Sequence, residues 1–217
     1  MQLLLTDRLA CPRCGPGFGL VLLADRMVDR RVHEGTLGCP NCRDSFTVHG
    51  GFADLRAPPR GEMQPGLAGA DPVQDDAPGD EPDTAEAERV TALLGIPRGP
   101  GTVALVGSPA RHARYLVEHV TDLDAVVVDA DTAGWSEHPD ISRIVSWPGL
   151  PLFSGMFRGA VVDGRLGKAL LFEAARVAAP KCRVVVVEAD DSAPAVLEEA
   201  GLTVMAREAG TVVAARG

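Results

Sequence analysis

Four cysteines near the start of the chain have the types and spacing of a metal-binding site. Cys11 and Cys14 form one C-x-x-C pair, Cys39 and Cys42 form a second, and 24 residues separate the pairs. Each pair lies in a predicted tight turn that can direct two thiolates at one ion, and two such turns make the tetrahedral site that Zn²⁺ prefers. All four ligands are cysteines, so no coordination position is left open for a substrate. The spacing therefore predicts a structural zinc ion.

Two other chemistries are open to the same four thiols. An iron ion accepts the same ligands, although nothing else in the sequence indicates electron transfer. Disulfide bonds are disfavoured in a reducing compartment. The chain begins MQLLLTDRLACP, without the basic leader and long apolar run of a signal peptide, and no apolar run approaches the roughly 18 residues of a membrane span. We therefore expect a cytoplasmic protein without membrane contact, in which the cysteines stay reduced.

The composition divides the chain into three parts. Residues 1–55 are too few to bury a sizeable core, so a bound metal would supply folding free energy there. Residues 56–83 are rich in Pro, Gly and Asp and carry two basic and seven acidic side chains, which predicts a disordered acidic linker. Residues 84–217 have the length of one medium domain. We expect the linker to separate two independent hydrophobic cores.

The charge argues against one class of partner. The net charge is −9, and none of the three parts is basic overall. Proteins that bind nucleic acid on their own carry a basic surface that neutralises phosphates. The sequence therefore gives no indication of nucleic-acid binding.

The first part resembles a known family in the residues around its cysteines. LLLTDRLACPRCG and TLGCPNCRDSFTVHGGFADL resemble the small zinc-ribbon family that acts as activating partner of RNA and protein methyltransferases. His49 and Gly50 stand where that family has Asp-Gly. The resemblance implies that the ribbon contacts a methyltransferase-like domain, in this chain or in another copy. A protein partner or self-association through the zinc ribbon is therefore expected.

The second half of the chain alternates helices and strands. An amphipathic helix is predicted over Thr84–Leu94, and an antiparallel hairpin closes the chain across Ala209-Gly210. Between them lie strands at Thr102–Val106, Ala125–Asp129, Ile141–Val145, Gly159–Val162 and Arg183–Val187, with helices at Pro109–Val120, Lys168–Ala178 and Ala193–Ala200. Alternation of this kind predicts an α/β fold with a doubly wound, mainly parallel sheet.

This order of elements and three phrases resemble the Rossmann-like S-adenosylmethionine-dependent methyltransferases. The phrases are LPLFSGMFRGAVVDG, FEAARVAAPKCRVVVVE and LEEAGLTV. They are mainly structural, so the resemblance implies the fold more strongly than the activity.

The family's cofactor loop, in which an acid precedes three alternating glycines, corresponds to VALVGSPARHAR. Gly107 matches the first glycine, but Leu105 replaces the acid, and Pro109 and Arg111 replace the later glycines. Asp129 matches the acid that binds the cofactor ribose. The resemblance thus implies Gly107 and Asp129 as cofactor-binding residues, while the substitutions remove most of the loop. We identify no catalytic residue.

The start of the helix after Gly107 allows two readings. Ser108 and Pro109 suit the cap and first position of an ordinary helix. Ser108, Arg111 and His112 could alternatively bind an anion at the helix N-terminus.

These observations leave three hypotheses for the function. The first is a zinc-binding, non-catalytic methyltransferase-like protein that acts in protein binding or assembly, with little or no affinity for S-adenosylmethionine. The second is an active S-adenosylmethionine-dependent methyltransferase with a divergent pocket, which the retained Asp129 favours. The third is a phosphate or nucleotide binder that uses the helix at Ser108.

Overall fold

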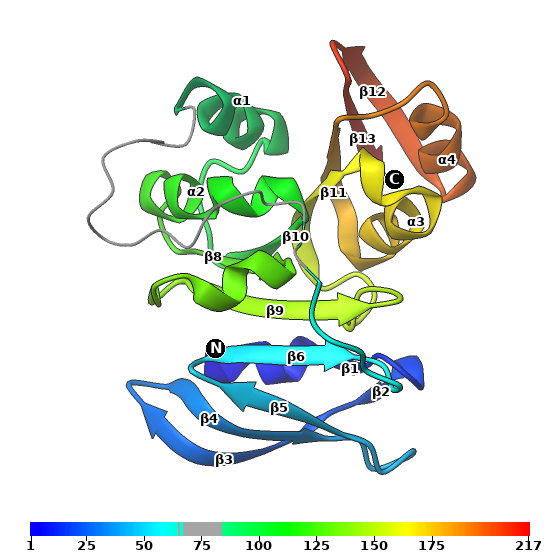
Figure 1. Ribbon diagram of the computed structural model, residues 1–217. Coiled ribbons are helices and arrows are strands. Elements are labelled where there is room, and N and C mark those ends of the chain that lie inside the picture. Colours follow the sequence, from blue (N-terminus) through cyan, green and yellow to red (C-terminus); the bar gives the residue numbers. More distant parts are fainter. Residues whose placement is uncertain (65, 67–83) are drawn as a thin grey trace.

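The computed structural model describes residues 1–64, 66 and 84–217 (Figure 1). Most of the predicted linker, residues 65 and 67–83, lies outside the described residues. The N-terminal segment, residues 1–56, begins with a 3-10 helix and continues as antiparallel strands: η1 (Leu3–Arg8), β1 (Ala10–Cys11), β2 (Gly15–Gly19), β3 (Val21–Val28), β4 (Arg31–Gly38), β5 (Ser45–His49) and β6 (Phe52–Arg56).

The second half of the chain alternates strands and helices as the sequence predicts. The hydrophobic runs become strands and the amphipathic stretches become helices, in the order α1 (Thr84–Leu94), β7 (Gly101–Val106), η2 (Ser108–His112), α2 (Ala113–His119), β8 (Leu123–Val128), η3 (Ala130–Gly134), β9 (Ile141–Trp147), β10 (Phe157–Asp163), η4 (Gly164–Leu166), α3 (Lys168–Val177), β11 (Ala178–Val187), α4 (Ala193–Glu199), β12 (Leu202–Glu208) and β13 (Thr211–Arg216).

Strands from both halves form one sheet of eleven strands in the order β12-β13-β11-β10-β7-β8-β9-β6-β5-β4-β3. The strands from β11 to β6 are parallel to one another, and β13 lies antiparallel between β11 and β12. In chain order, the seven strands after α1 are arranged 3-2-1-4-5-7-6. The predicted α/β fold with a mainly parallel sheet and a final antiparallel hairpin is confirmed.

Helices cover the two faces of this sheet unequally. On one face, α1 and α2 pack through Val90, Leu94 and Leu116 over the central strands. On the other, α3 and α4 cover only the β10–β13 half, with Leu171 and Leu197 among their buried side chains. The second face over β7–β9 therefore needs another cover.

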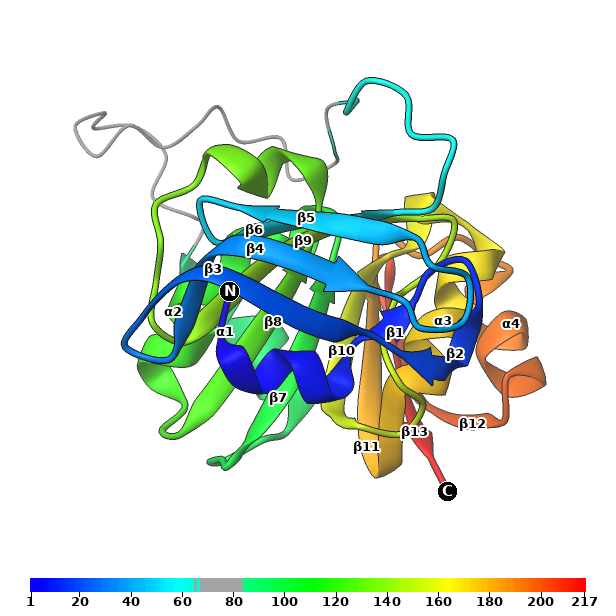
Figure 2. The ribbon, with the colours of Figure 1, turned by 90° about the horizontal axis from the view of Figure 1, so that it is seen from below.

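The N-terminal segment provides that cover. Leu5 and Leu9, near η1, belong to the same buried cluster as Ala104, Val126 and Ile144 of β7–β9. Figure 2 shows the N-terminal strands and η1 lying across this side of the sheet. The expected separation into two cores is therefore wrong, because one core includes side chains from both halves. The boundaries 1–55, 56–83 and 84–217 as units of folding stay a prediction.

Pairing of β6 with β9 joins the halves along the backbone. The two strands run parallel in a register from Phe52 opposite Arg143 to Arg56 opposite Trp147. Arg143 is buried and donates to the carbonyl oxygen of Gly50 at 2.7 Å. Arg31 donates to the carbonyl oxygens of Pro139 and Ile141. The sequence left open whether the N-terminal segment contacts its own chain, and here it does.

Ser108 differs from one of its predicted roles. It does not cap a helix, because its hydroxyl is buried and donates to the carboxylate of Asp163. Two features beside β9 matter for the site: Trp147 ends this strand with 64% of its surface exposed, and the connection from β8 contains only the short η3.

Candidate functional site: a cysteine cluster and the carboxyl edge of the sheet

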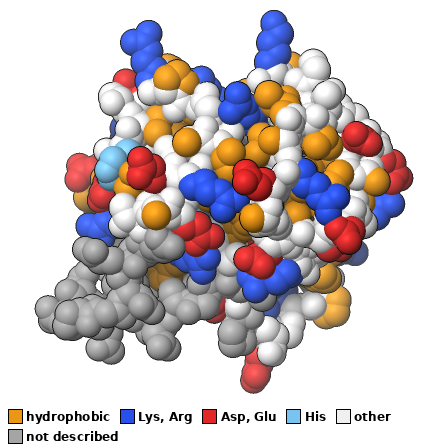
Figure 3. Space-filling model, turned by 90° about the horizontal axis from the view of Figure 1, so that it is seen from above, with side chains coloured by type: hydrophobic (Ala, Val, Ile, Leu, Met, Phe, Trp, Pro, Cys, Tyr) orange, Lys and Arg blue, Asp and Glu red, His pale blue; other side chains and the backbone are white. Residues whose placement is uncertain are grey.

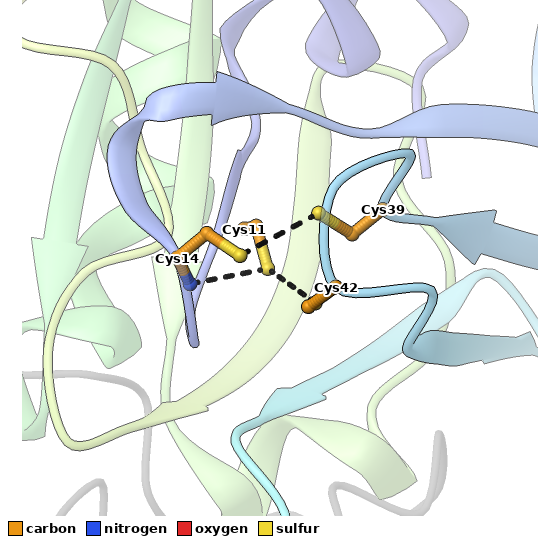
Figure 4. A group of neighbouring side chains, drawn as sticks. All are labelled: Cys11, Cys14, Cys39 and Cys42. Atoms are coloured by element: carbon orange, nitrogen blue, oxygen red, sulfur yellow. Dashed lines mark hydrogen bonds between the residues drawn. The ribbon is translucent and has the colours of Figure 1, made fainter.

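The four predicted cysteines meet at one point (Figure 4). Cys11 and Cys14 come from the turn after β1, and Cys39 and Cys42 from the turn after β4. All four Sγ atoms lie within 4.8 Å of one another, with 3.7 Å between Cys11 and Cys42 and 3.8 Å between Cys14 and Cys39. An ion bound tetrahedrally to sulfur at about 2.3 Å requires sulfurs about 3.8 Å apart, whereas a disulfide requires about 2.05 Å. The cluster therefore fits a tetrahedral metal ion.

The backbone and neighbouring side chains fix the orientation of these thiols. Gly15 follows the first pair with φ at +88°, the left-handed conformation that glycine adopts without strain. The N–H of Cys14 donates to Cys11 Sγ at 3.4 Å, and the amide of Asn41 donates to Cys14 Sγ at 3.2 Å. Asp44 lies 3.5 Å from Cys42 Sγ and pairs with Arg13. Donors that point at sulfur stabilise thiolates, the form that binds a metal.

The four thiols do not ionise alike. Burial opposes ionisation of Cys39, but N–H groups of Cys42 and Asn41 donate to its sulfur and lower its pKa to about 7. The backbone N–H of Asp44 favours the Cys42 thiolate, but burial and the three neighbouring thiols outweigh it and raise the pKa of Cys42 to about 12. Four negative sulfurs this close repel one another, so a cation is needed to hold all four as thiolates.

The other candidate residues lie where the parallel strands end. Gly107 follows β7 with φ at +75°, and a side chain there would meet Leu166 at 2.8 Å and Asp163 at 3.1 Å. Local backbone and packing thus require this glycine whether or not a ligand binds.

Asp163, which the sequence analysis did not single out, closes the edge beside Gly107. Its carboxylate is fully buried and accepts hydrogen bonds from Ser108, from the Arg165 guanidinium at 2.9 and 2.6 Å and from the Arg165 N–H at 2.9 Å. Burial opposes its ionisation, but these donors outweigh that effect and lower the pKa of Asp163. The sequence offered one signal for Asp163, since this acid directly ends a run of buried apolar residues, Ala160 to Val162. The neighbouring strand β7 ends at Val106, just before Gly107.

The residues that replace the family's acid and glycines have structural roles. Leu105 is fully buried in the cluster beneath α1 and α2. Pro109 is buried in η2, and Arg111 turns outward to pair with Glu86 of α1 at 2.9 Å.

Asp129 lines a cavity of about 390 Å³ at the carboxyl edge. It is buried, and its Oδ1 accepts a hydrogen bond from the N–H of Asp131 at 3.0 Å. The ends of the parallel strands, with η4 and α3, form one side of the cavity, here called the sheet side. Its residues include Val106, Gly107, Val128, Ser146, Trp147, Leu166 and Leu170. Residues 57 and 59–64 line it as well. The structure thus brings Gly107 and Asp129 to one pocket, and their role in binding a cofactor stays a prediction.

The histidines of the N-terminal segment pair with acidic side chains. His33 pairs with Glu137 and His49 with Glu34, in each case through Nδ1.

On the face that Figure 3 shows, basic side chains are interspersed with acidic ones. Among the described residues, no helix is long and apolar enough to cross a membrane.

Sequence comparisons identify no family. No protein-family model matches the chain, and no curated protein matches it.

Solved structures are similar in fold. A geranyl diphosphate methyltransferase in complex with SAM is 12% identical, with a TM-score of 0.50 over 70% of this chain and 98% of that one. A complex between the Haloferax volcanii Trm112 methyltransferase activator and a candidate methyltransferase is 14% identical, with a TM-score of 0.49 over 59% of this chain and 88% of that one. A candidate sarcosine dimethylglycine methyltransferase from Galdieria sulphuraria is 12% identical, with a TM-score of 0.45 over 57% of this chain and 62% of that one. This chain therefore spans less than two thirds of that protein. At 12% identity, the likeness to the geranyl diphosphate methyltransferase establishes the fold alone, that of the Rossmann-like methyltransferases.

Proposed function

We propose that this chain is a zinc-stabilised, methyltransferase-like protein without catalytic activity, which acts in protein binding or assembly. One observation carries the proposal: at the end of β7, Leu105 is buried in an apolar cluster where the family resemblance requires an acid. The loop that follows is fastened by contacts within the protein, since Ser108 donates to Asp163. Such a loop has no acid left for the methionine end of S-adenosylmethionine.

Zinc has a structural role in this proposal. Cys11, Cys14, Cys39 and Cys42 would hold the ion as four thiolates, which leaves no position for a substrate. The bound ion would supply free energy of folding to the turns after β1 and β4.

An active methyltransferase is the second candidate, and Asp129 favours it. This carboxylate lines the carboxyl-edge pocket, where a ribose hydroxyl could donate to it. Against this candidate, loss of one charge-assisted hydrogen bond at position 105 costs about 1.5–3 kcal/mol, and the altered turn adds to that cost.

Phosphate binding at Ser108 is not supported. The hydroxyl is buried against the carboxylate of Asp163, which already supplies a negative charge beside this turn. A phosphate would be repelled by that carboxylate.

A role in binding is supported by the outer edge of the N-terminal segment. β3 ends the sheet, so one side of its backbone pairs with no other strand in the part of the chain that the structure describes. Large apolar side chains are exposed along and beside it: Leu4, Phe18, Val21, Leu23, Met27 and Val28. An apolar edge of this kind suits the addition of a strand from a partner.

Calorimetry with S-adenosylmethionine tests the proposed loss of the cofactor site. We expect no saturable heat at micromolar protein, because the loss of the acid and the altered turn together weaken binding by roughly three orders of magnitude. A micromolar Kd that is lost in Asp129→Ala would overturn the proposal and establish the active-enzyme candidate. Asp191→Ala, at a fully exposed acid outside the pocket residues, is the control.

Sedimentation tests the binding role. If the β3 edge supports self-association, Leu23→Ser should lower the apparent mass at high concentration, while Met205→Ser, an exposed site on β12, should not. If the wild-type chain sediments as a monomer at all concentrations, binding through this edge would require a different protein.

A further inference from the structure

The carboxyl-edge pocket has an outer wall that belongs to neither the sheet nor its helices. After β6, the residues from Ala57 to Gln64, here called the cover segment, pass beside the end of β9 (Figure 1). The N–H of Ala57 donates to the carbonyl oxygen of Trp147 at 2.9 Å, and seven of the eight cover residues line the pocket. The wall opposite the sheet edge is therefore built by the chain that leaves the N-terminal segment.

Two arginines hold the cover segment in its turned-back path. Arg56 donates through Nε and Nη2 to the two carboxylate oxygens of Asp54. Its Nη1 donates to the carbonyl oxygens of Gly61 and Glu62, at 3.0 and 3.2 Å. Arg60 donates to the carbonyl oxygen of Arg56 at 2.7 Å. These bonds connect charged donors to backbone acceptors, so they fix the path of the backbone itself.

Arg60 also fastens the cover segment to the strand that follows the cysteine cluster. Its Nη2 donates to the carbonyl oxygen of Ser45 at 2.9 Å, and its guanidinium lies 4.7 Å from the centre of the Phe46 ring. Ser45 begins β5, three positions after Cys42. Arg60 thus attaches the outer wall of the pocket to the start of β5.

Among the described residues, one more bond holds the chain just after the cover segment: the N–H of Gly66 donates to Asp131 Oδ1 at 2.9 Å. Every residue from 58 to 64 is exposed, including Met63 at 42%. A segment with few buried apolar contacts opens at a small cost in free energy, so loss of a few hydrogen bonds decides its position. The sheet side of the pocket, in contrast, is built from buried residues such as Val106 and Leu170.

From this arrangement we propose that the cover segment is a gate over the carboxyl-edge pocket, held closed by the attachment of Arg60 to Ser45. The inference goes beyond the proposed function, because it gives this pocket a ligand class and assigns control of its access to the N-terminal segment. The gate admits uncharged molecules with an apolar face. Both arginines already donate to groups of the protein, and most of the pocket's sheet-side residues are apolar.

Binding of the neutral apolar dye Nile red to the full-length, metal-loaded chain tests the gate. Arg60→Met keeps an unbranched apolar side chain near Phe46 but removes the hydrogen bonds to Ser45 and Arg56. We expect the Kd of the dye to fall about tenfold, the factor that corresponds to one hydrogen bond from a charged donor. Arg114→Met, at an exposed arginine of α2 paired with Glu118, is the control and should leave the Kd unchanged.

A second variant assigns the dye to the pocket. Leu166→Trp places a larger side chain at the sheet side of the pocket, beside Gly107. Combined with Arg60→Met, it should abolish the gain in dye binding. The gate is overturned if Arg60→Met leaves dye binding unchanged while circular dichroism shows an intact fold, or if the gain persists in the double variant.

Calorimetry with S-adenosylmethionine on Arg60→Met separates this inference from the proposed function. If S-adenosylmethionine binds only when Arg60 is replaced, the gate stands and the proposed loss of the cofactor site fails. If dye binding rises and S-adenosylmethionine still does not bind, both proposals stand.

Discussion

Arg143 of β9 donates a hydrogen bond to the carbonyl oxygen of Gly50, in the turn that leads into β6. The same guanidinium donates to the carbonyl oxygens of Thr132 and Trp135 beside η3. Burial lowers the pKa of Arg143, and carbonyl oxygens are its hydrogen-bond partners. One side chain thus fastens the N-terminal segment to the parallel sheet.

Arg143→Met should destabilise the whole chain. It removes a donor from three carbonyl oxygens, of which that of Thr132 keeps the N–H of Trp135. Each buried acceptor left unsatisfied costs about 1–3 kcal/mol, although removing a buried charge offsets part of this. Urea unfolding followed by circular dichroism and tryptophan fluorescence measures the change. We expect both signals to report one shared transition, since the halves share one core. Arg114→Met should change the free energy of unfolding by less than about 0.5 kcal/mol. Two separate transitions in the wild-type chain would contradict the shared core.

Metal removal should affect more than the cysteine turns. Elemental analysis should find one zinc ion per chain, as a complete tetrahedral cysteine site requires. Chelation, or Cys42→Ser, should lower the melting temperature of the entire chain, because Cys11 and Cys39 lie in the core that also contains Val126 and Ile144. The matched control is Cys182→Ser, since this cysteine lies on β11 outside the cluster. Protein that holds no zinc, or mainly iron, would contradict the assignment.

Restoring the family's acid should harm the fold. Leu105→Asp places a carboxylate in the apolar cluster under α1 and α2, at a cost of about 3–5 kcal/mol for an uncompensated buried charge. Leu105→Asn, which adds a neutral polar group of the same size, should cost less. Denaturant unfolding of the two variants gives the comparison. Equal stability of Leu105→Asp and wild type would mean that position 105 can accommodate an acid.

Acid pH should weaken the contact at the start of η2. Because the pKa of Asp163 is lowered in the folded state, the unfolded chain takes up a proton first as pH falls. The stabilisation is therefore complete well above the ordinary aspartate value of about 3.9 and is lost as pH falls below it. Asp163→Asn should be less stable at pH 7 and lose less stability between about pH 5 and 3 than wild type. Equal pH dependence of the two proteins in urea unfolding would contradict a lowered pKa.

Local patterns predicted the elements well. The helix Thr84–Leu94 has the predicted bounds, and the final hairpin turns at Ala209-Gly210 as expected. Amphipathic spacing and turn residues act over a few positions, so a single sequence carries them. The meeting of the four cysteines was predictable for the same reason, because metal-ligand spacing is itself a short pattern.

Long-range contacts were not predictable in the same way. The pairing of β6 with β9 joins residues far apart in the sequence. The residues of β6 do not indicate which strand β6 will pair with. Serine is a common helix-capping residue, but the hydroxyl of Ser108 donates instead to the buried carboxylate of Asp163. The composition of the cover segment predicts a linker. Its path is held by arginines that donate to backbone carbonyl oxygens, and such bonds produce no hydrophobic pattern in the sequence.

The pairing of β6 with β9 also sets the order in which a growing chain can complete its fold. The N-terminal segment is synthesised before its partner strand, Ile141–Trp147, which follows only after the predicted linker and α1, β7, η2, α2, β8 and η3. Until then the β6 edge and the apolar side chains around Leu5 and Leu9 have no sheet to cover. A metal ion bound by the four cysteines needs only residues from the first 42, so it can order this segment on the ribosome well before the sheet exists.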